Sequence, residues 1–299
     1  MTIPVLVSMP PEHGIGSRLA VAISAKYASF ELRRFPDTEV YLRYDTELSG
    51  RQVIVLGALD RPDEKILPLL FAAAAARDLG AKEIGLVCPY LPYMRQDKRF
   101  QTGEAITSAY FAEMLSAHFD WLVTVDPHLH RRSSLSEVYW IPVQTLQAAP
   151  LLAAWIKREV PNPILIGPDS ESEQWVDGVA RAAGAPSMVL QKVRRGDRDV
   201  EISVPDIERW RDRTPVLIDD VISTGRTMIE TIKHLNKAGL AQPVCIAVHG
   251  IFAGTAYEDL VSAGAGRIAT SNSVMHATNV IDLCDLLAQG AKGLLRHGT

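Results

Sequence analysis

The feature that most constrains the fold of this 299-residue chain is a regular alternation of short apolar runs with longer segments of helical spacing. The apolar runs are rich in Val, Ile and Leu and occupy residues 53–56, 84–87, 122–125, 164–166, 188–190, 216–218 and 245–248. The helical segments occupy residues 65–79, 104–117, 173–183 and 226–238. This alternation predicts an α/β fold, with parallel sheets covered by helices on both faces and ligands at the carboxyl ends of the strands.

The chain is long enough for about two domains, each able to bury its own core. The segment 141–150 contains Pro142 and Pro150 and is the expected boundary. We therefore expect two similar α/β domains, residues 1–145 and residues 146–299, each with a mainly parallel sheet flanked by helices.

Composition excludes several classes of function. A net charge of −4 gives no basic surface for nucleic acid. The three cysteines are odd in number and far apart, which suits neither a disulfide framework nor a metal site and favours the reducing cytoplasm. The N-terminus lacks the basic start of a leader peptide, and the most apolar run, residues 67–76, is too short to cross a membrane. We expect a cytoplasmic protein.

The most specific motif is residues 216–227, an apolar strand followed by Asp219, Asp220 and a small, hydroxyl-rich turn. Gly225 lets the backbone approach a ligand closely, and the amides of Ser223 to Thr227 open a helix whose N-terminus favours phosphate. The two carboxylates are suited to sugar hydroxyls or to the Mg²⁺ of a phosphate. The simpler alternative is an ordinary helix cap, because Asp and Thr are common there.

This motif resembles the phosphoribosyl-pyrophosphate loop of type I phosphoribosyltransferases and of the related ribose-phosphate pyrophosphokinases. In that superfamily the loop holds the 5-phosphate and the paired acids face the ribose diol. The resemblance implies a ribose 5-phosphate site made of Asp219, Asp220, Ser223, Thr224, Gly225, Arg226 and Thr227. The motif does not by itself distinguish the transferases from the kinases.

The segment from Tyr93 to Thr107 does distinguish them. Its Y-M-R-Q-D and G-E-A-I-T runs resemble signatures of the pyrophosphokinases, and the resemblance places Arg95, Gln96 and Asp97 in the ATP site. Arg95 offers a planar fork for phosphate oxygens. A solvated basic loop is the alternative, although it leaves the preceding aromatic and apolar residues unexplained. The chain has no Walker loop, so ATP requires such a separate site.

Two strand ends resemble the phosphate and metal positions of the same family. Asp126-Pro127-His128 is similar to its D-L-H run, which implies that His128 lies at the ATP phosphates and ligates Mg²⁺. Asp169 is similar to the acid beside the transferred diphosphate and is the second candidate metal ligand. The turn that follows carries Glu171 in place of paired glycines, which leaves a catalytically silent homologue open.

A charged run at residues 190–199 leaves the strand at 188–190. Its Lys192-x-Arg194 pair is similar to the K-x-R of the family's catalytic flexible loop, so the resemblance makes Lys192 and Arg194 the catalytic residues. Two mobile cations would close over the diphosphoryl group and exclude water. The alternative is a solubilising surface loop.

Residues 34–40 resemble the family's R-F-S-D-G-E hairpin. There the aromatic stacks on adenine in a neighbouring subunit's site and the acids read the purine. The resemblance therefore implies that Phe35, Asp37 and Glu39 bind ATP within a homodimer or higher homo-oligomer. An edge hairpin with Phe35 in its own core is the alternative.

The resemblance extends from about Arg34 to Gly254 and implies two phosphoribosyltransferase-type domains. It implies a ribose-phosphate diphosphokinase that uses Mg²⁺ to convert ATP and ribose 5-phosphate into phosphoribosyl pyrophosphate and AMP. Two alternatives remain open at this point. One is a phosphoribosyltransferase that consumes phosphoribosyl pyrophosphate, and the other is a catalytically silent regulatory homologue.

Overall fold

The computed structural model describes residues 2–10, 14–129, 131–167, 172–194, 200–203 and 207–295. These residues form two compact units. Unit 1 contains the chain up to Leu146 together with the segment from Leu283 onward, and unit 2 contains residues 147–282. Each unit has its own sheet and its own helices, so each is described by itself.

Unit 1 is built on a six-stranded sheet in which every neighbouring pair of strands is parallel. The order across the sheet is β2 (Lys26–Tyr27), β1 (Val5–Ser8), β5 (Gln52–Leu56), β6 (Glu83–Cys88), β7 (Trp121–Val125) and β8 (Val143–Leu146). A separate antiparallel hairpin joins β3 (Phe30–Arg34) to β4 (Val40–Tyr44). The central strands are rich in Val, Ile and Leu because both faces of a parallel sheet are buried.

Unit 2 repeats this order with its own six parallel strands. They are β10 (Ser187–Val189), β9 (Pro163–Gly167), β13 (Thr214–Ile222), β14 (Val244–Gly250), β15 (Arg267–Ser271) and β16 (Asn279–Ile281). A second antiparallel pair, β11 (Gln191–Arg194) and β12 (Val200–Ser203), follows β10 as the pair β3–β4 follows β2. Each strand of unit 1 therefore corresponds to the strand of unit 2 whose number is higher by eight, from β1 and β9 to β8 and β16.

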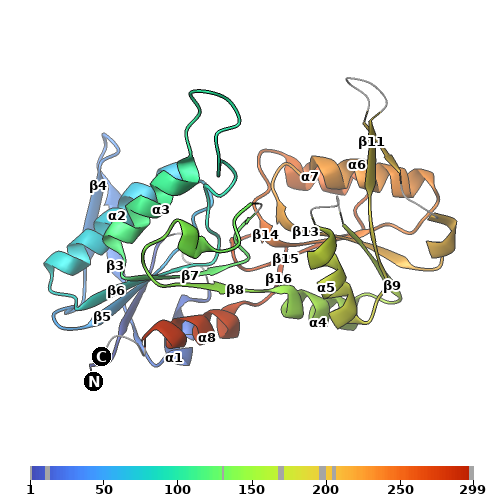
Figure 1. The fold of residues 1–299 in the computed structure, drawn as a ribbon. Coiled ribbons are helices and arrows are strands. Elements are labelled where there is room, and N and C mark those ends of the chain that lie inside the picture. Colours follow the sequence, from blue (N-terminus) through green and yellow to red (C-terminus); the bar gives the residue numbers. More distant parts are fainter. Residues whose placement is uncertain are drawn as a thin grey trace. The chain divides into compact units, whose positions relative to one another are not determined.

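Helices cover both faces of each sheet (Figure 1). In unit 1, α2 (Pro62–Asp78) and α3 (Thr107–His118) lie on one face, and α1 (Gly16–Ala22) and α8 (Cys284–Leu295) lie on the other. In unit 2, α4 (Ala149–Glu159) pairs with α5 (Glu173–Ala183), and α6 (Arg226–Lys237) pairs with α7 (Ala256–Ala263). Two short 3-10 helices complete the elements of the described residues, η1 (Leu135–Glu137) and η2 (Ile207–Trp210). Within the described ranges, no helix combines the length and hydropathy that a bilayer-spanning segment requires.

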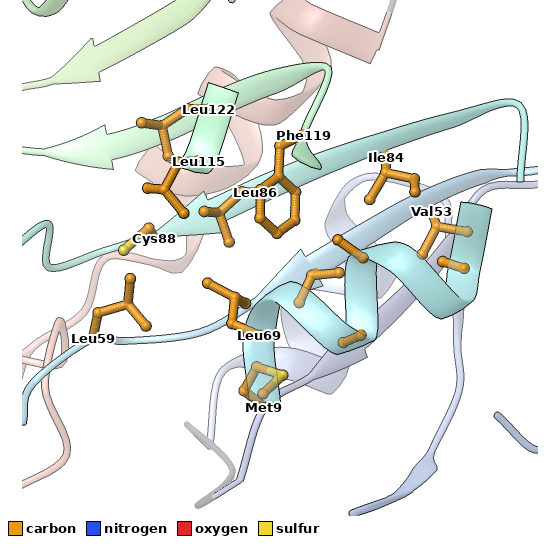
Figure 2. Close-up of a cluster of buried hydrophobic side chains, with 14 of the residues drawn as sticks. Met9, Val53, Leu59, Leu69, Ile84, Leu86, Cys88, Leu115, Phe119 and Leu122 are labelled. Atoms are coloured by element: carbon orange, nitrogen blue, oxygen red, sulfur yellow. The ribbon is translucent and has the colours of Figure 1, made fainter. Parts of the chain in front are cut away.

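The core of unit 1 lies between the sheet and the helices α2 and α3 (Figure 2). Leu69 of α2 is fully buried, as are Ile84 and Leu86 of β6 and Leu115 of α3. Burial of each such side chain contributes about 1.5–3 kcal/mol. The alanines of α2 let the helix approach the strands closely, and three of them are completely buried. This packing gives the loops at the edge of the sheet a rigid base.

The predicted α/β fold with two similar domains is confirmed. The seven expected strands and four expected helices are all present, with ends that shift by one to three residues in most cases. The exception is the strand expected at 216–218, which runs on to Ile222. The C-terminal helix also differs from the expected domain bounds, because α8 (Cys284–Leu295) packs against α1, β7 and β8 in unit 1.

Candidate active site

The candidate ribose-phosphate residues lie at the carboxyl edge of the unit 2 sheet, where β13 passes into α6. Gly225 is the N-cap of α6 and has a φ of 65°, a left-handed conformation that favours glycine. Its carbonyl accepts the first hydrogen bond of the helix, from the amide of Ile229 at 2.8 Å. The first turn of α6 contains no acidic residue. The amide donors of the first turn and the positive end of the helix dipole therefore meet without a carboxylate in that turn.

Asp219 and Asp220 lie inside β13, whereas the sequence suggested that the strand ends before them. The strand continues because Asp219 pairs with Ala247 and Ile222 pairs with Gly250 of β14. Both acids are half-buried, and the amide of Asp220 donates to the Asp219 carboxylate at 2.9 Å. Pairing with β14 holds both acids on a rigid strand directly before the turn, which suits carboxylates that orient a diol.

In unit 1, the segment from Tyr93 to Asp97 forms the loop after β6. Tyr93 has a φ of 61°, which is strained for an aromatic residue. Its ring packs on Phe111 of α3 at 4.8 Å between centroids, and its hydroxyl donates to the carboxylate of Asp63 in α2. This hydrogen bond and burial raise the pKa of Tyr93 to about 12. Two helices therefore fix the start of the loop, while Arg95 stays exposed.

Asp97 is buried and joins this loop to the loop after β7. The Arg131 guanidinium donates to its Oδ1 at 3.0 Å, and Arg132 donates to its backbone carbonyl at 3.2 Å. The second carboxylate oxygen, Oδ2, is buried without a hydrogen-bond partner among the described residues. An unpaired buried acceptor costs about 1–3 kcal/mol, which a bound donor would recover.

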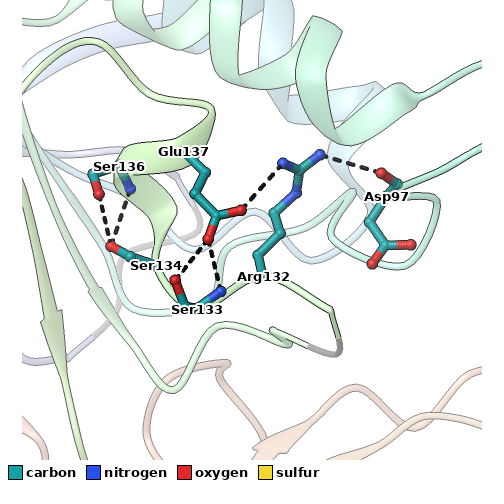
Figure 3. A network of polar contacts seen from close by, with 6 residues as sticks. All are labelled: Asp97, Arg132, Ser133, Ser134, Ser136 and Glu137. Carbon is teal, nitrogen blue, oxygen red and sulfur yellow. Dashed lines mark hydrogen bonds and ion pairs between the residues drawn. The ribbon is translucent and has the colours of Figure 1, made fainter.

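Arg132 also forms an ion pair with Glu137, with 3.8 Å between its Nη1 and the carboxylate Oε2 (Figure 3). The hydroxyl and amide of Ser133 donate to the same carboxylate and, together with Arg132, hold the pKa of Glu137 below its ordinary value. Sequence reasoning missed both arginines. The available signal was that these two arginines lie three and four residues after His128, in the segment that follows a strand end, where adjacent charged side chains are not needed for core packing.

His128 is half-buried in the loop that follows β7. Asp126 opens this loop with a φ of 34°, and its amide donates to the carbonyl of Leu146 at 2.9 Å. The ion pair between Arg131 and Asp97 connects this loop to the loop that contains Arg95 and Asp97. The structure thus brings together two of the three segments that sequence assigned to ATP.

The third segment is the expected hairpin, and it forms as β3–β4. Phe35 lies at its tip with 41% of its surface exposed, an edge contact to Tyr41 and the Arg33 guanidinium 4.9 Å from its ring centre. Asp37 accepts the amide of Glu39 at 3.3 Å. Arg34, the last residue of β3, donates to the carbonyl of Glu64 in α2 at 3.1 Å, which anchors the turn end of the hairpin to that helix. The ring is therefore not part of the core of unit 1.

Three other candidates are only partly described. Lys192 and Arg194 lie in β11, which pairs with β12, and residues 195–199 of the expected charged loop lie outside the described residues. Asp169 lies outside the described residues. Within the residues that the structure does describe, no group of three or more His, Cys, Asp or Glu side chains is placed to hold a metal.

Comparisons with known proteins agree with this geometry. Residues 5–118 match the N-terminal domain of ribose phosphate pyrophosphokinase, and residues 144–284 match the phosphoribosyl transferase domain. A ribose-phosphate pyrophosphokinase of Methanopyrus kandleri is 31% identical over 94% of this chain and 96% of its own length. The chain belongs to the ribose-phosphate pyrophosphokinase family. A second family member, from Methanothermobacter thermautotrophicus, is 32% identical over 88% of this chain and 90% of its own length.

The fold of the family is also found in a solved structure. The crystal structure of phosphoribosylpyrophosphate synthetase from Mycobacterium smegmatis superposes with a TM-score of 0.85 and covers 99% of both chains at 23% identity. The match to the N-terminal pyrophosphokinase domain leaves the phosphoribosyltransferase alternative without support, because that alternative does not explain the presence of unit 1.

Proposed function

We propose that this ribose-phosphate pyrophosphokinase family member transfers the diphosphoryl group of ATP to the anomeric hydroxyl of ribose 5-phosphate. A bond forms between the anomeric oxygen and the β-phosphorus, and the bond between that phosphorus and the oxygen bridging to the α-phosphate breaks. AMP leaves with the bridging oxygen, and the hydroxyl proton passes to solvent. The products are 5-phosphoribosyl pyrophosphate and AMP.

The observation that carries the sugar half of this proposal is the passage from β13 to α6. Asp219 and Asp220 would accept hydrogen bonds from the ribose diol, and the amides and hydroxyls of Ser223 to Thr227 would hold the 5-phosphate. Holding both ends of the sugar presents its anomeric hydroxyl in one orientation, which lowers the entropic part of the barrier.

The ATP half rests on the loops after β6 and β7. Arg95 would bind phosphate oxygens and the orphaned Oδ2 of Asp97 would accept a hydrogen bond from the nucleotide or from a phosphate-bound water. Mg²⁺, held through the phosphates with His128 and Asp169, would supply charge neutralisation. Lys192 and Arg194 would stabilise the charge that accumulates between the anomeric oxygen and AMP.

The test is an assay with Mg²⁺, ATP and ribose 5-phosphate in which AMP and phosphoribosyl pyrophosphate are both quantified. We expect the two products in equal amounts. Formation of ADP, which is the product of single phosphoryl transfer, would contradict the proposal.

We also propose that the hairpin β3–β4 completes the ATP site of a second copy of the chain. Its support is the exposed Phe35 ring, held away from the unit 1 core with Asp37 and Glu39 beside it. Mixed dimers of Phe35→Ala and Lys192→Ala chains test this. Sites formed in trans leave one site intact and restore activity well above either mutant homodimer, whereas sites formed within one chain restore nothing.

A further inference from the structure

The loop that follows β14 contains a strained aromatic residue. Phe252 has a φ of 45°, and a bulky side chain rarely occupies this left-handed region. Such residues persist only where the surrounding structure holds them, and they gather at functional sites. What holds Phe252 is therefore informative.

Two other rings hold it. The Phe252 ring lies 4.4 Å from the His276 ring and 5.7 Å from the Tyr257 ring, between centroids, and Tyr257 and His276 are 5.1 Å apart. His276 is fixed in turn, because its Nδ1 lies 2.9 Å from the hydroxyl of Thr278 and its amide donates to Asn279 at 2.9 Å. The three rings come from the loop after β14, from α7 and from the loop after β15.

The backbone around Phe252 is hydrogen-bonded to the start of the proposed phosphate loop. The amides of Ile251 and Phe252 donate to the carbonyl of Ile222 at 2.9 and 3.1 Å, and the amide of Ala253 donates to the carbonyl of Ser223 at 3.0 Å. In a trans peptide the N–H points opposite to the C=O. Holding these two carbonyls therefore turns the N–H groups of Ser223 and Thr224 away from the Phe252 loop.

We propose that Phe252, locked by Tyr257 and His276, is a positioning residue that aims the amides of Ser223 and Thr224 at the 5-phosphate of the sugar. This inference rests on the proposed function, since it assumes that the loop binds ribose 5-phosphate. Phe252 acts through the backbone and does not touch the ligand.

The experiment measures the dissociation constants of ribose 5-phosphate and of ATP by calorimetry on Phe252→Ala, with inorganic phosphate as a second probe. We expect the constants for ribose 5-phosphate and phosphate to rise about tenfold, the effect of losing one charge-assisted hydrogen bond. ATP binding stays unchanged, and turnover at saturating sugar stays near wild type. Phe252→Tyr keeps the ring and should restore binding, and the exposed Met275, next to His276, supplies Met275→Ala as the matched control.

A purely structural role would reduce ATP and sugar binding together, or reduce only the amount of folded protein, and either result overturns the inference. Unchanged sugar binding in folded Phe252→Ala overturns it while leaving the proposed function standing. Wild-type protein that binds no ribose 5-phosphate removes both. If Phe252→Ala does not fold, His276→Ala, which removes a half-buried stacking partner, carries the same test with the same expected direction.

Discussion

Units 1 and 2 share one strand order, yet the same junction has opposite chemistry in each. After β5 and after β13 the chain enters a helix through a left-handed residue, Arg61 in unit 1 and Gly225 in unit 2. The first turn of α2 contains Asp63 and Glu64 and begins with Pro62, which has no amide hydrogen. Anion binding at a helix N-terminus needs amide donors and no negative charge in the first turn, and of these two helices α6 meets both conditions better.

The loops after the next strand differ in a related way. Tyr93 after β6 and Phe252 after β14 are both aromatic residues with positive φ. Tyr93 is held by a hydrogen bond to α2 and braces the proposed ATP loop, whereas Phe252 is held by two rings and braces the proposed sugar loop. A common architecture thus fixes where strained loops occur, and the side chains decide which ligand each loop serves.

The largest expected effect separates the two hairpins. Lys192→Ala, in β11, should lower turnover by about 10²- to 10³-fold, the range for losing one preorganised charge donor at a transition state. Phe35→Ala, on the equivalent hairpin of unit 1, should instead weaken ATP binding. Steady-state kinetics with Lys233→Ala as a control for loss of a surface charge measures both. Unchanged turnover in Lys192→Ala would contradict a catalytic role for this residue and favour a surface role for β11.

The next effect compares the acids. Asp220→Ala should weaken ribose 5-phosphate binding by about 10- to 100-fold, because a hydrogen bond to a charged group contributes about 1.5–3 kcal/mol, and ATP binding should hold. Asp60 lies between β5 and α2, the junction of unit 1 that corresponds to the β13–α6 junction, and its carboxylate pairs with Lys65 at 2.5 Å. Asp60→Ala should therefore lower stability by about 1–3 kcal/mol, the cost of leaving the Lys65 ammonium without this partner, and leave sugar affinity unchanged. Loss of ATP affinity in Asp220→Ala would mean that the two subsites are assigned the wrong way round.

The third prediction is a smaller change in stability, which has opposite signs at the two strand-to-helix junctions. Gly225→Ala should destabilise the protein by about 1–2 kcal/mol, because alanine disfavours a left-handed backbone and its Cβ would lie 3.3 Å from Leu260. Arg61→Gly should stabilise it by up to about 1 kcal/mol, since glycine relieves the same strain at some cost in chain entropy. Thermal unfolding measures both shifts. Unfolding temperatures that shift in the same direction in both variants would contradict the view that the two left-handed residues have equivalent roles.

The smallest effect is a pH dependence. The pKa of Tyr93 is raised from 10.0 to about 12, so the folded state favours the protonated phenol. Its contribution to stability is complete below pH 10 and is lost as the pH rises through about 12. The stability advantage of wild type over Tyr93→Phe should be constant from pH 8 to 10 and then shrink. An advantage that persists at pH 12 would contradict the assigned hydrogen bond.

The sequence by itself determined the fold class, the family and the identity of most candidate residues. Hydrophobic period is a local property, and so are motifs such as Asp219 to Thr227, which fold within a single strand–turn–helix passage. Family membership, fold and the kinase activity expected from them agree with the comparisons.

Only the tertiary structure decided which distant residues support the site. No local pattern links Asp97 to Arg131 and Arg132, or Phe252 to His276, because these residues meet only when neighbouring strands align their carboxyl ends. The extension of β13 through the two acids depends on pairing with β14, and the place of α8 in unit 1 depends on its packing against α1, β7 and β8. Such pairing and burial depend on the whole fold, and the linear sequence carries no direct record of them.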